Sequence, residues 1–171
     1  MDTPDTSANS ASSADDLHGR YMGIALEEAR IGAAEGEQPF GAVVVLDGEI
    51  VVRTHSIKVA TSDCTAHSET RAISLATRKL QRRHIPEAVF YATCEPCPMC
   101  LGAILNSGIG TLVLGARNTD IQVAGSLAFS YKDYSAERFA EWVGWKLDVV
   151  TGVRHDECVA LYRDAQVPLS R

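Results

Sequence analysis

The sequence predicts one α/β domain with a mostly parallel sheet that is covered by helices and has a β-hairpin at one edge. Two observations lead to this fold class. Runs of β-branched and aromatic residues of strand length alternate with stretches of helical periodicity along most of the chain. In addition, a chain of 171 residues, of which 46% are hydrophobic, is long enough for one domain with a well-developed core.

The beginning of the chain differs in composition from the rest. Residues 1–16 are rich in Ser, Ala, Asp and Thr, and they have neither the basic start nor the apolar centre of a secretory signal. This composition is typical of a disordered polar tail, which we expect to end near Asp16. The folded domain is then expected to occupy residues 17–171.

The first elements of that domain are a helix and a hairpin. Apolar residues at helical spacing predict an amphipathic helix over residues 17–35, which Gly36 ends. Residues 40–55 predict the hairpin, because two β-branched runs flank Asp47-Gly48, the dipeptide that favours a type I′ turn.

The later elements alternate between helix and strand. In order, the sequence predicts helix 65–83, strand 88–94, helix 98–108, strand 111–116, helix 135–145, strand 146–152 and helix 156–165. Thr65 is a candidate N-cap for the first of these helices, and Gly108 is expected to end the second. Ligands bind such sheets where strands lead into helix N-termini, so the beginnings of these helices are candidate sites.

Charge and cysteine content exclude several classes of function. The net charge is −6, whereas a protein that binds duplex nucleic acid normally has a broad basic face. No apolar run approaches the roughly 18–20 residues that span a bilayer, so no membrane association is expected. The five cysteines form an odd set and nothing suggests export, which predicts reduced thiols and a cytoplasmic location.

Two of the predicted helix beginnings carry reactive side chains. One contains His67 and the other contains Cys97 and Cys100, which lie three residues apart on one face of a first helical turn. The unpaired N–H groups and the positive end of the helix dipole favour thiolates there. Two thiolates and one imidazole leave the fourth zinc position open for water, which is typical of catalytic rather than structural zinc.

Glu69 separates a catalytic site from a structural one. A structural zinc site needs a fourth Cys or His, whereas a hydrolytic site needs a proton shuttle beside the activated water. The order H-x-E and then P-C-x-x-C is the signature of zinc deaminases, in which the Glu is not a ligand. The motifs therefore predict Zn²⁺ held by His67, Cys97 and Cys100 with Glu69 as catalytic residue. A non-catalytic, zinc-stabilised binding module is the alternative from another class.

The segments "GEQPFGAVVV", "TAHSETRAI", "TCEPCPMCLGAI" and "IGTLVLGARNTD" resemble the zinc-dependent cytidine deaminase superfamily, in its branch of nucleobase and tRNA adenosine deaminases. The resemblance covers about residues 20–165. It implies a three-layer α/β/α sandwich around a mixed five-stranded sheet, and a homodimer. It also implies that Glu69 takes a proton from the activated water, passes it to a ring nitrogen and helps to protonate the departing ammonia.

The residues expected around the substrate depart from the family pattern. Phe40 is implied as a stacking wall for a base, and Ser68 stands where the family usually has Ala or Gly. Ser56 occupies the place of a substrate-binding Asn, and no acid is found near Ala128, where guanine deaminases carry a second proton shuttle. These departures favour a small free amino-heterocycle of pyrimidine, triazine or purine type, other than the usual guanine or cytosine.

A tRNA-specific adenosine deaminase is the alternative enzyme, and it needs a basic path for RNA. The candidate cations on helix 65–83 are Arg71, Arg78, Lys79, Arg82 and Arg83. Cations near a helix C-terminus also complement the helix dipole, and the acidic balance of the chain favours that explanation. Nucleic acid is therefore not the expected partner.

The remaining unusual residues are expected to be structural. Six aromatic residues are expected to pack in the core or at a subunit interface, and the alternative is that one of their rings covers a planar ligand. They are Phe129, Tyr131, Tyr134, Phe139, Trp142 and Trp145. Small packing residues are expected at Cys64, Cys94 and Cys158, with Cys94 as an alternative metal ligand. Surface positions are expected for His18, His84 and His155.

Overall fold

A computed structural model describes residues 7–123 and 131–165, and these residues build a mixed five-stranded sheet of order β2-β1-β3-β4-β5. The strands are β1 (Gly41–Leu46), β2 (Glu49–His55), β3 (Val89–Cys94), β4 (Thr111–Ala116) and β5 (Asp148–Val150). β1 runs antiparallel to β2 and β3, whereas β3, β4 and β5 are parallel to one another. The mixed α/β sheet that was expected is therefore confirmed.

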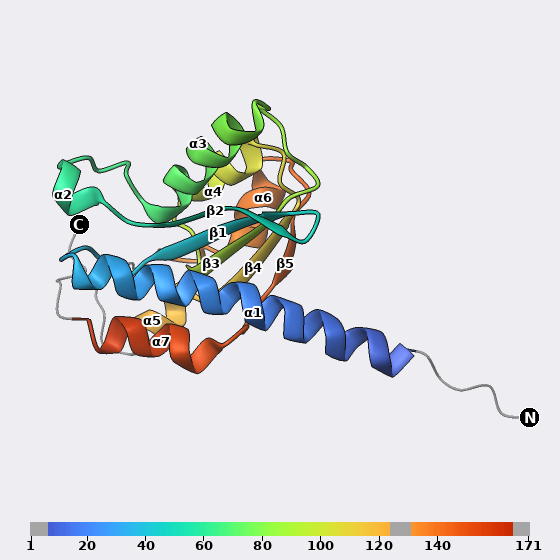
Figure 1. Cartoon of the computed structure of the whole chain (residues 1–171), viewed down its shortest axis with the longest axis horizontal. Helices are drawn as coiled ribbons and strands as arrows, with labels where there is room; N and C mark the ends of the chain where they lie inside the picture. The colour runs from blue at the N-terminus through green and yellow to red at the C-terminus, as the bar shows by residue number, and fades with distance from the viewer. Residues whose placement is uncertain (1–6, 124–130, 166–171) are drawn as a thin grey trace, which may run out of the picture.

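Helices cover both faces of this sheet, which gives three layers (Figure 1). One face carries α1 (Ser7–Ala34) and α7 (His155–Arg163), with the short α5 (Asn118–Val123) packed against α7. The other face carries α3 (Ser68–Leu80), α4 (Pro98–Asn106) and α6 (Ala136–Trp142). The short α2 (Lys58–Thr61) follows β2. Among the described residues, no helix is both long enough and apolar enough to cross a bilayer.

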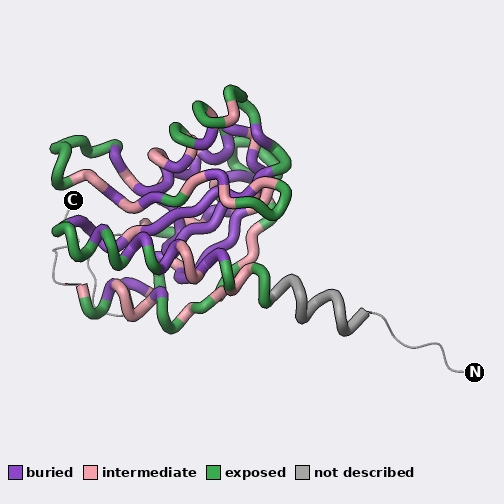
Figure 2. Tube along the Cα trace, viewed as in Figure 1, coloured by how far each residue is buried: buried purple, intermediate pink, exposed green. Residues whose placement is uncertain are grey.

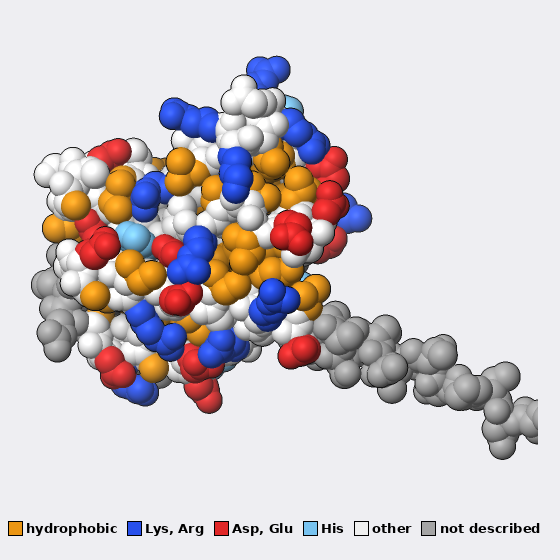
Figure 3. Space-filling view, viewed as in Figure 1, with side chains coloured by type: hydrophobic (Ala, Val, Ile, Leu, Met, Phe, Trp, Pro, Cys, Tyr) orange, Lys and Arg blue, Asp and Glu red, His pale blue; other side chains and the backbone are white. Residues whose placement is uncertain are grey.

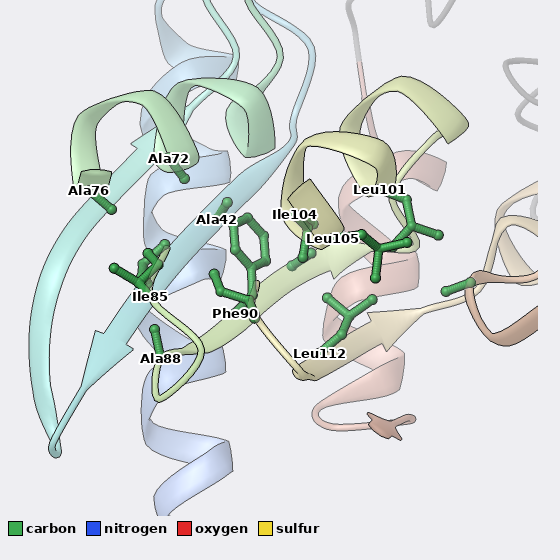
Figure 4. Packing of buried hydrophobic residues seen from close by; sticks show 14 of the residues in the cluster. Ala42, Ala72, Ala76, Ile85, Ala88, Phe90, Leu101, Ile104, Leu105 and Leu112 are labelled. Carbon is green, nitrogen blue, oxygen red and sulfur yellow. The ribbon is translucent and has the colours of Figure 1, made fainter. Parts of the chain in front are cut away.

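The sheet separates two hydrophobic cores, because successive side chains of a strand point to opposite faces. Alternate residues of β1, β3 and β4, such as Ala42, Phe90 and Leu112, pack under α3 and α4 (Figure 4). Their neighbours, such as Val43 and Tyr91, pack under α1 and α7. The central strands are consequently buried on both faces (Figure 2), which explains why they are nearly continuous apolar runs in the sequence.

Two turn predictions are confirmed by the backbone. Asp47 and Gly48 have φ values of 52° and 78°, as a type I′ turn requires at both central positions. Gly108 has a φ of 82° directly after α4, where its N–H donates to the carbonyl of Leu105 (2.8 Å). A glycine accepts this left-handed conformation without strain, so it ends the helix.

The expected boundaries need three corrections. α1 begins at Ser7 and not at residue 17, so it runs through most of the segment that was expected to be a disordered tail. Residues 7–16 contain no Pro or Gly, so a composition that lacks large apolar residues still permits a helix. Thr65 is not the N-cap of α3, because His67 occupies that position. The short helices α2 and α5 were not predicted.

Candidate active site

The reactive residues meet at one edge of the sheet because two helices begin there. His67 is the N-cap residue of α3, and Cys97 is the N-cap residue of α4, directly after β3. Both residues have extended backbone conformations, and their carbonyls accept the first helical hydrogen bonds, from Arg71 N–H (3.1 Å) and Leu101 N–H (2.8 Å). Pro98 occupies the first turn of α4, where no N–H is needed.

His67, Cys97 and Cys100 form a compact donor set. The two Sγ atoms lie 3.4 Å apart, and His67 Nδ1 lies 3.5 Å from Cys100 Sγ and 3.9 Å from Cys97 Sγ. A tetrahedral zinc ion with bonds of about 2.3 Å to sulfur and about 2.0–2.1 Å to nitrogen places its ligand atoms about 3.5–3.8 Å apart. The three distances between the donor atoms are therefore close to the spacing that zinc requires.

The three ligands are electrostatically coupled. The hydrogen-bond contact between the Sγ atoms of Cys97 and Cys100 lowers the pKa of the Cys97 thiol and raises the pKa of the Cys100 thiol. The hydrogen bond with Cys97 also raises the pKa of His67. A thiolate beside an imidazole is a soft donor set that suits zinc. Within the part of the chain that the structure describes, these are the three residues that could hold a metal ion.

Glu69 lies beside this donor set without belonging to it. Its side chain is buried, and Oε2 accepts a hydrogen bond from Ser68 Oγ (2.8 Å). Burial, followed by the nearby charge of Cys97, raises the pKa of the Glu69 carboxyl group. A buried carboxyl group next to an open metal position is the arrangement that a proton shuttle needs.

A small pocket contains Glu69 and two of the candidate ligands. Its described lining residues are Phe40, His67, Glu69, Glu95, Cys97 and Asn118. The ring of Phe40 packs against Tyr162 of α7, with a centroid distance of 5.1 Å. Glu95 and Asn118 were assigned no role from the sequence. They lie inside the quoted segments "TCEPCPMCLGAI" and "IGTLVLGARNTD", so the signal was their position within those segments.

The two serines expected near the substrate have different positions. The hydroxyl of Ser68 is used by Glu69, while its carbonyl accepts a hydrogen bond from Thr54 Oγ1 (2.8 Å). Ser56 is buried, its N–H donates to Phe40 O (3.2 Å), and its Oγ accepts from Lys58 N–H (3.4 Å). It is not among the described residues that line the pocket.

Two of the minor expectations are wrong. Cys64 is exposed, because it lies in the loop between α2 and α3, whereas Cys94 and Cys158 are buried as expected. His18 is half-buried, because its Nδ1 is 2.9 Å from Tyr91 Oη, and is not a surface residue. Cys94 lies outside the donor set, and its thiol contacts Asn118 Oδ1 (3.6 Å).

The aromatic residues after β4 form a chain that reaches the surface. Ring centroids are 5.3 Å apart for Tyr131 and Tyr134, and 6.2 Å apart for Tyr134 and Phe139. Trp142 continues the chain at 6.1 Å from Phe139 but is 81% exposed, so it is not a core residue of this chain. Ala128 and Phe129 lie outside the described residues.

Comparison with known proteins agrees with this geometry. The profile of the cytidine and deoxycytidylate deaminase zinc-binding region matches residues 15–116. The tRNA-specific adenosine deaminase of Bacillus subtilis is 36% identical over 138 residues, or 81% of each chain. The guanine deaminase of Bacillus subtilis is 40% identical over 96 residues, or 56% of this chain and 62% of the relative. The structure of a guanine deaminase from Nitrosomonas europaea is similar with a TM-score of 0.73 and 29% identity, over 86% of this chain and 83% of that one.

The chain therefore belongs to the cytidine and deoxycytidylate deaminase family, as its motifs suggested. It is a zinc-binding deaminase, and the His/Cys/Cys donor set fits the metal of that family.

Proposed function

We propose that the protein hydrolytically deaminates a small free amino-heterocycle, a nucleobase or nucleobase analogue, and releases ammonia and the oxo product. The main support for this proposal is the lining of the pocket that contains Glu69. Phe40 and Asn118 supply a flat apolar wall and an amide, and no Lys or Arg is among the described lining residues. Such a lining suits an uncharged planar ring better than a phosphodiester chain.

The residues divide the reaction between them. His67, Cys97 and Cys100 would hold the zinc ion, which would supply a water molecule activated at neutral pH. Glu69, oriented by Ser68, accepts the proton of that water and delivers it to the ring nitrogen next to the carbon under attack. The same carboxylate then takes the remaining proton of the hydroxyl group that was added to the ring and delivers it to the amine, so that the C–N bond breaks, ammonia leaves and a lactam remains. Phe40 stacks on the heterocycle.

The basic residues on α3 and directly after it support a small substrate. Three of the five candidates are engaged within the domain, since Arg71 donates to the carbonyl of His55, Lys79 donates to a β2 carbonyl (2.7 Å), and Arg82 pairs with Glu87 (2.9 Å). Arg78 is exposed near the C-terminal end of α3, whereas the pocket lies at its N-terminal end. The helical rise from His67 to Arg78 separates the two by about 16 Å.

A tRNA adenosine deaminase is the second candidate, because the similarity to the Bacillus subtilis tRNA-specific enzyme extends over 81% of the chain.

One experiment separates the candidates. Purified protein with measured zinc content is assayed for ammonia release from free guanine, adenine, cytosine and melamine, from the corresponding nucleosides, and from a tRNA anticodon stem-loop. Turnover of a free base supports our proposal, and turnover of the RNA alone refutes it. Bound zinc without any turnover favours a binding module.

We also propose a homodimer that uses the surface of α4 and α6. Large apolar side chains are exposed there, and they are Met99, Trp142, Val143 and Trp145. A monomer rarely leaves such a set in water, and aromatic and Met side chains are typical of protein interfaces. Sedimentation should give a dimer for the native chain and a monomer for Trp142→Glu. A location in the reducing cytoplasm remains a prediction from the cysteine content.

A further inference from the structure

Glu95 is a buried acidic residue for which the proposed reaction has no use. It lies between β3 and the turn that carries Cys97, and its side chain is only 3% exposed. Oε1 accepts hydrogen bonds from Arg117 Nη1 (2.8 Å) and from the backbone N–H of Ala136 (2.9 Å). Oε2 accepts from the backbone N–H and the side-chain Nδ2 of Asn118 (both 3.3 Å). Burial of a carboxyl group is costly unless such partners are present.

These contacts join three segments around the pocket. Asn118 begins α5 and lines the pocket, Ala136 begins α6, and Glu95 stands two residues before a metal ligand. A second contact holds the same parts together, because Tyr134 Oη donates to the carbonyl of Pro96 (2.6 Å). The turn that carries Cys97 is therefore tied to the segments that follow β4.

The orientation of Asn118 follows from this arrangement. Its Nδ2 donates to Glu95, so its Oδ1 is directed away from that carboxyl group. Within the described residues, the partner of Oδ1 is the Cys94 thiol at 3.6 Å, which is a weak donor. An amide oxygen accepts two hydrogen bonds, so Oδ1 retains capacity for an N–H group of a ligand in the pocket.

We propose that Glu95 is a positioning residue that fixes Asn118 as a specificity-determining hydrogen-bond acceptor for the substrate. The proposal rests on the proposed function. Asn118 Oδ1 accepts a ring N–H or amino group of the heterocycle, and Glu95 keeps the amide from rotating. Asn118, which follows β4 and begins α5, thus supplies an amide group to the pocket. No amide is supplied from the end of β2, because Ser56 occupies that position.

The chain offers a matched control for Glu95. Glu137 pairs with the same Arg117 through Nη1 (2.9 Å) and Nη2 (2.5 Å), and this contact lowers the pKa of Glu137 to about 2. Glu137 is half exposed and is not among the described residues that line the pocket. Replacement of Glu137 by Gln therefore removes a charge from the same arginine and leaves Asn118 in place.

The experiment compares zinc-loaded full-length wild type, Glu95→Gln, Glu137→Gln and Asn118→Ala. In Glu95→Gln an NH₂ group replaces one carboxylate oxygen. Where it replaces Oε2, it faces the two N–H donors of Asn118 and can no longer accept their hydrogen bonds. We expect Glu95→Gln to retain zinc, to raise KM for the preferred free base about tenfold and to change kcat less than about threefold. Asn118→Ala should raise KM similarly. A double variant that combines Glu95→Gln with Asn118→Ala should have the same KM as Asn118→Ala alone. Glu137→Gln should keep the wild-type KM.

Hydrogen–deuterium exchange gives a readout that does not depend on turnover. Residues 117–121 and 134–140 should exchange faster in Glu95→Gln than in Glu137→Gln. The proposal is overturned if Glu95→Gln matches the control in KM and exchange, or if it loses only stability and active fraction at unchanged KM. A zinc-loaded wild type without turnover on any base defeats the proposed function alone, because the exchange comparison still decides whether Glu95 positions Asn118.

Discussion

The two ends of α3 carry opposite kinds of residues. The N-terminal end holds His67 and the buried Glu69, which face the metal-binding turn of α4. The C-terminal end carries Arg78 and Lys79 in its last turn, and these side chains are exposed. Acidic and basic side chains are interspersed over the face of the molecule that Figure 3 shows.

This difference follows from the physics of a helix. Unpaired N–H groups and the positive dipole end favour anionic ligands at the beginning, whereas cations complement the carbonyls at the end. A run of basic residues in the same segment as a catalytic motif is therefore not evidence that the two act together. The catalytic end should respond strongly to substitution, and the basic end should respond weakly.

The largest effect is expected when the donor set is broken. Cys97→Ala leaves two ligands, so bound zinc should fall from about one ion per chain to nearly none, with a lower melting temperature because metal binding contributes to folding. Metal analysis and thermal unfolding measure both quantities. Cys64→Ala is the control, since Cys64 is exposed and lies outside the donor set. Full zinc content in Cys97→Ala would remove Cys97 from the site.

Glu69→Gln should come next. Gln has nearly the same shape but accepts no proton, so ammonia release should fall by about 10²- to 10⁴-fold while zinc is retained. Glu87→Gln is the control, because Glu87 is exposed and pairs with Arg82 far from the pocket. Wild-type turnover in Glu69→Gln would contradict the role given to this residue.

Ser68→Ala should have a smaller effect. It removes the hydrogen bond to Glu69 Oε2, and a bond to a charged group contributes about 1.5 kcal/mol, so kcat should fall about tenfold at nearly constant KM. Steady-state kinetics measure both constants. Ser74→Ala is the control on the exposed part of the same helix. An unchanged kcat would show that Glu69 needs no such support.

The smallest effect is expected at the other end of α3. Arg78 near the end of α3 and Arg83 in the loop that follows are exposed and far from the pocket, so Arg78→Ala and Arg83→Ala should change turnover of a free base less than about twofold. The same variants should be tested for ammonia release from the anticodon stem-loop. A selective loss with RNA would support the basic path and the tRNA alternative.

Local patterns were sufficient for much of the fold. The bounds of β4, the turn at Asp47 and the end of α4 at Gly108 depend on residues close in sequence, and all three were predicted. The spacing of the donor set was equally readable, because Cys97 and Cys100 share one helical turn.

Features that depend on distant residues were not predicted. The roles of Glu95 and Asn118 arise from contacts across 23 residues of sequence. His18 is half-buried because Tyr91, from a strand much later in the chain, reaches it. The start of α1 was missed for another reason, since the absence of large apolar residues limits burial but does not prevent helix formation.

The central claim is that one zinc ion and Glu69 act together on a free heterocycle. The most direct test measures zinc content and ammonia release on the same samples of wild type and Glu69→Gln, with the base panel and the stem-loop as substrates. Our account predicts about one zinc ion per chain in both proteins, ammonia from a free base with the wild type alone, and none from the RNA. Undiminished ammonia release by Glu69→Gln, or release from the stem-loop only, would contradict it.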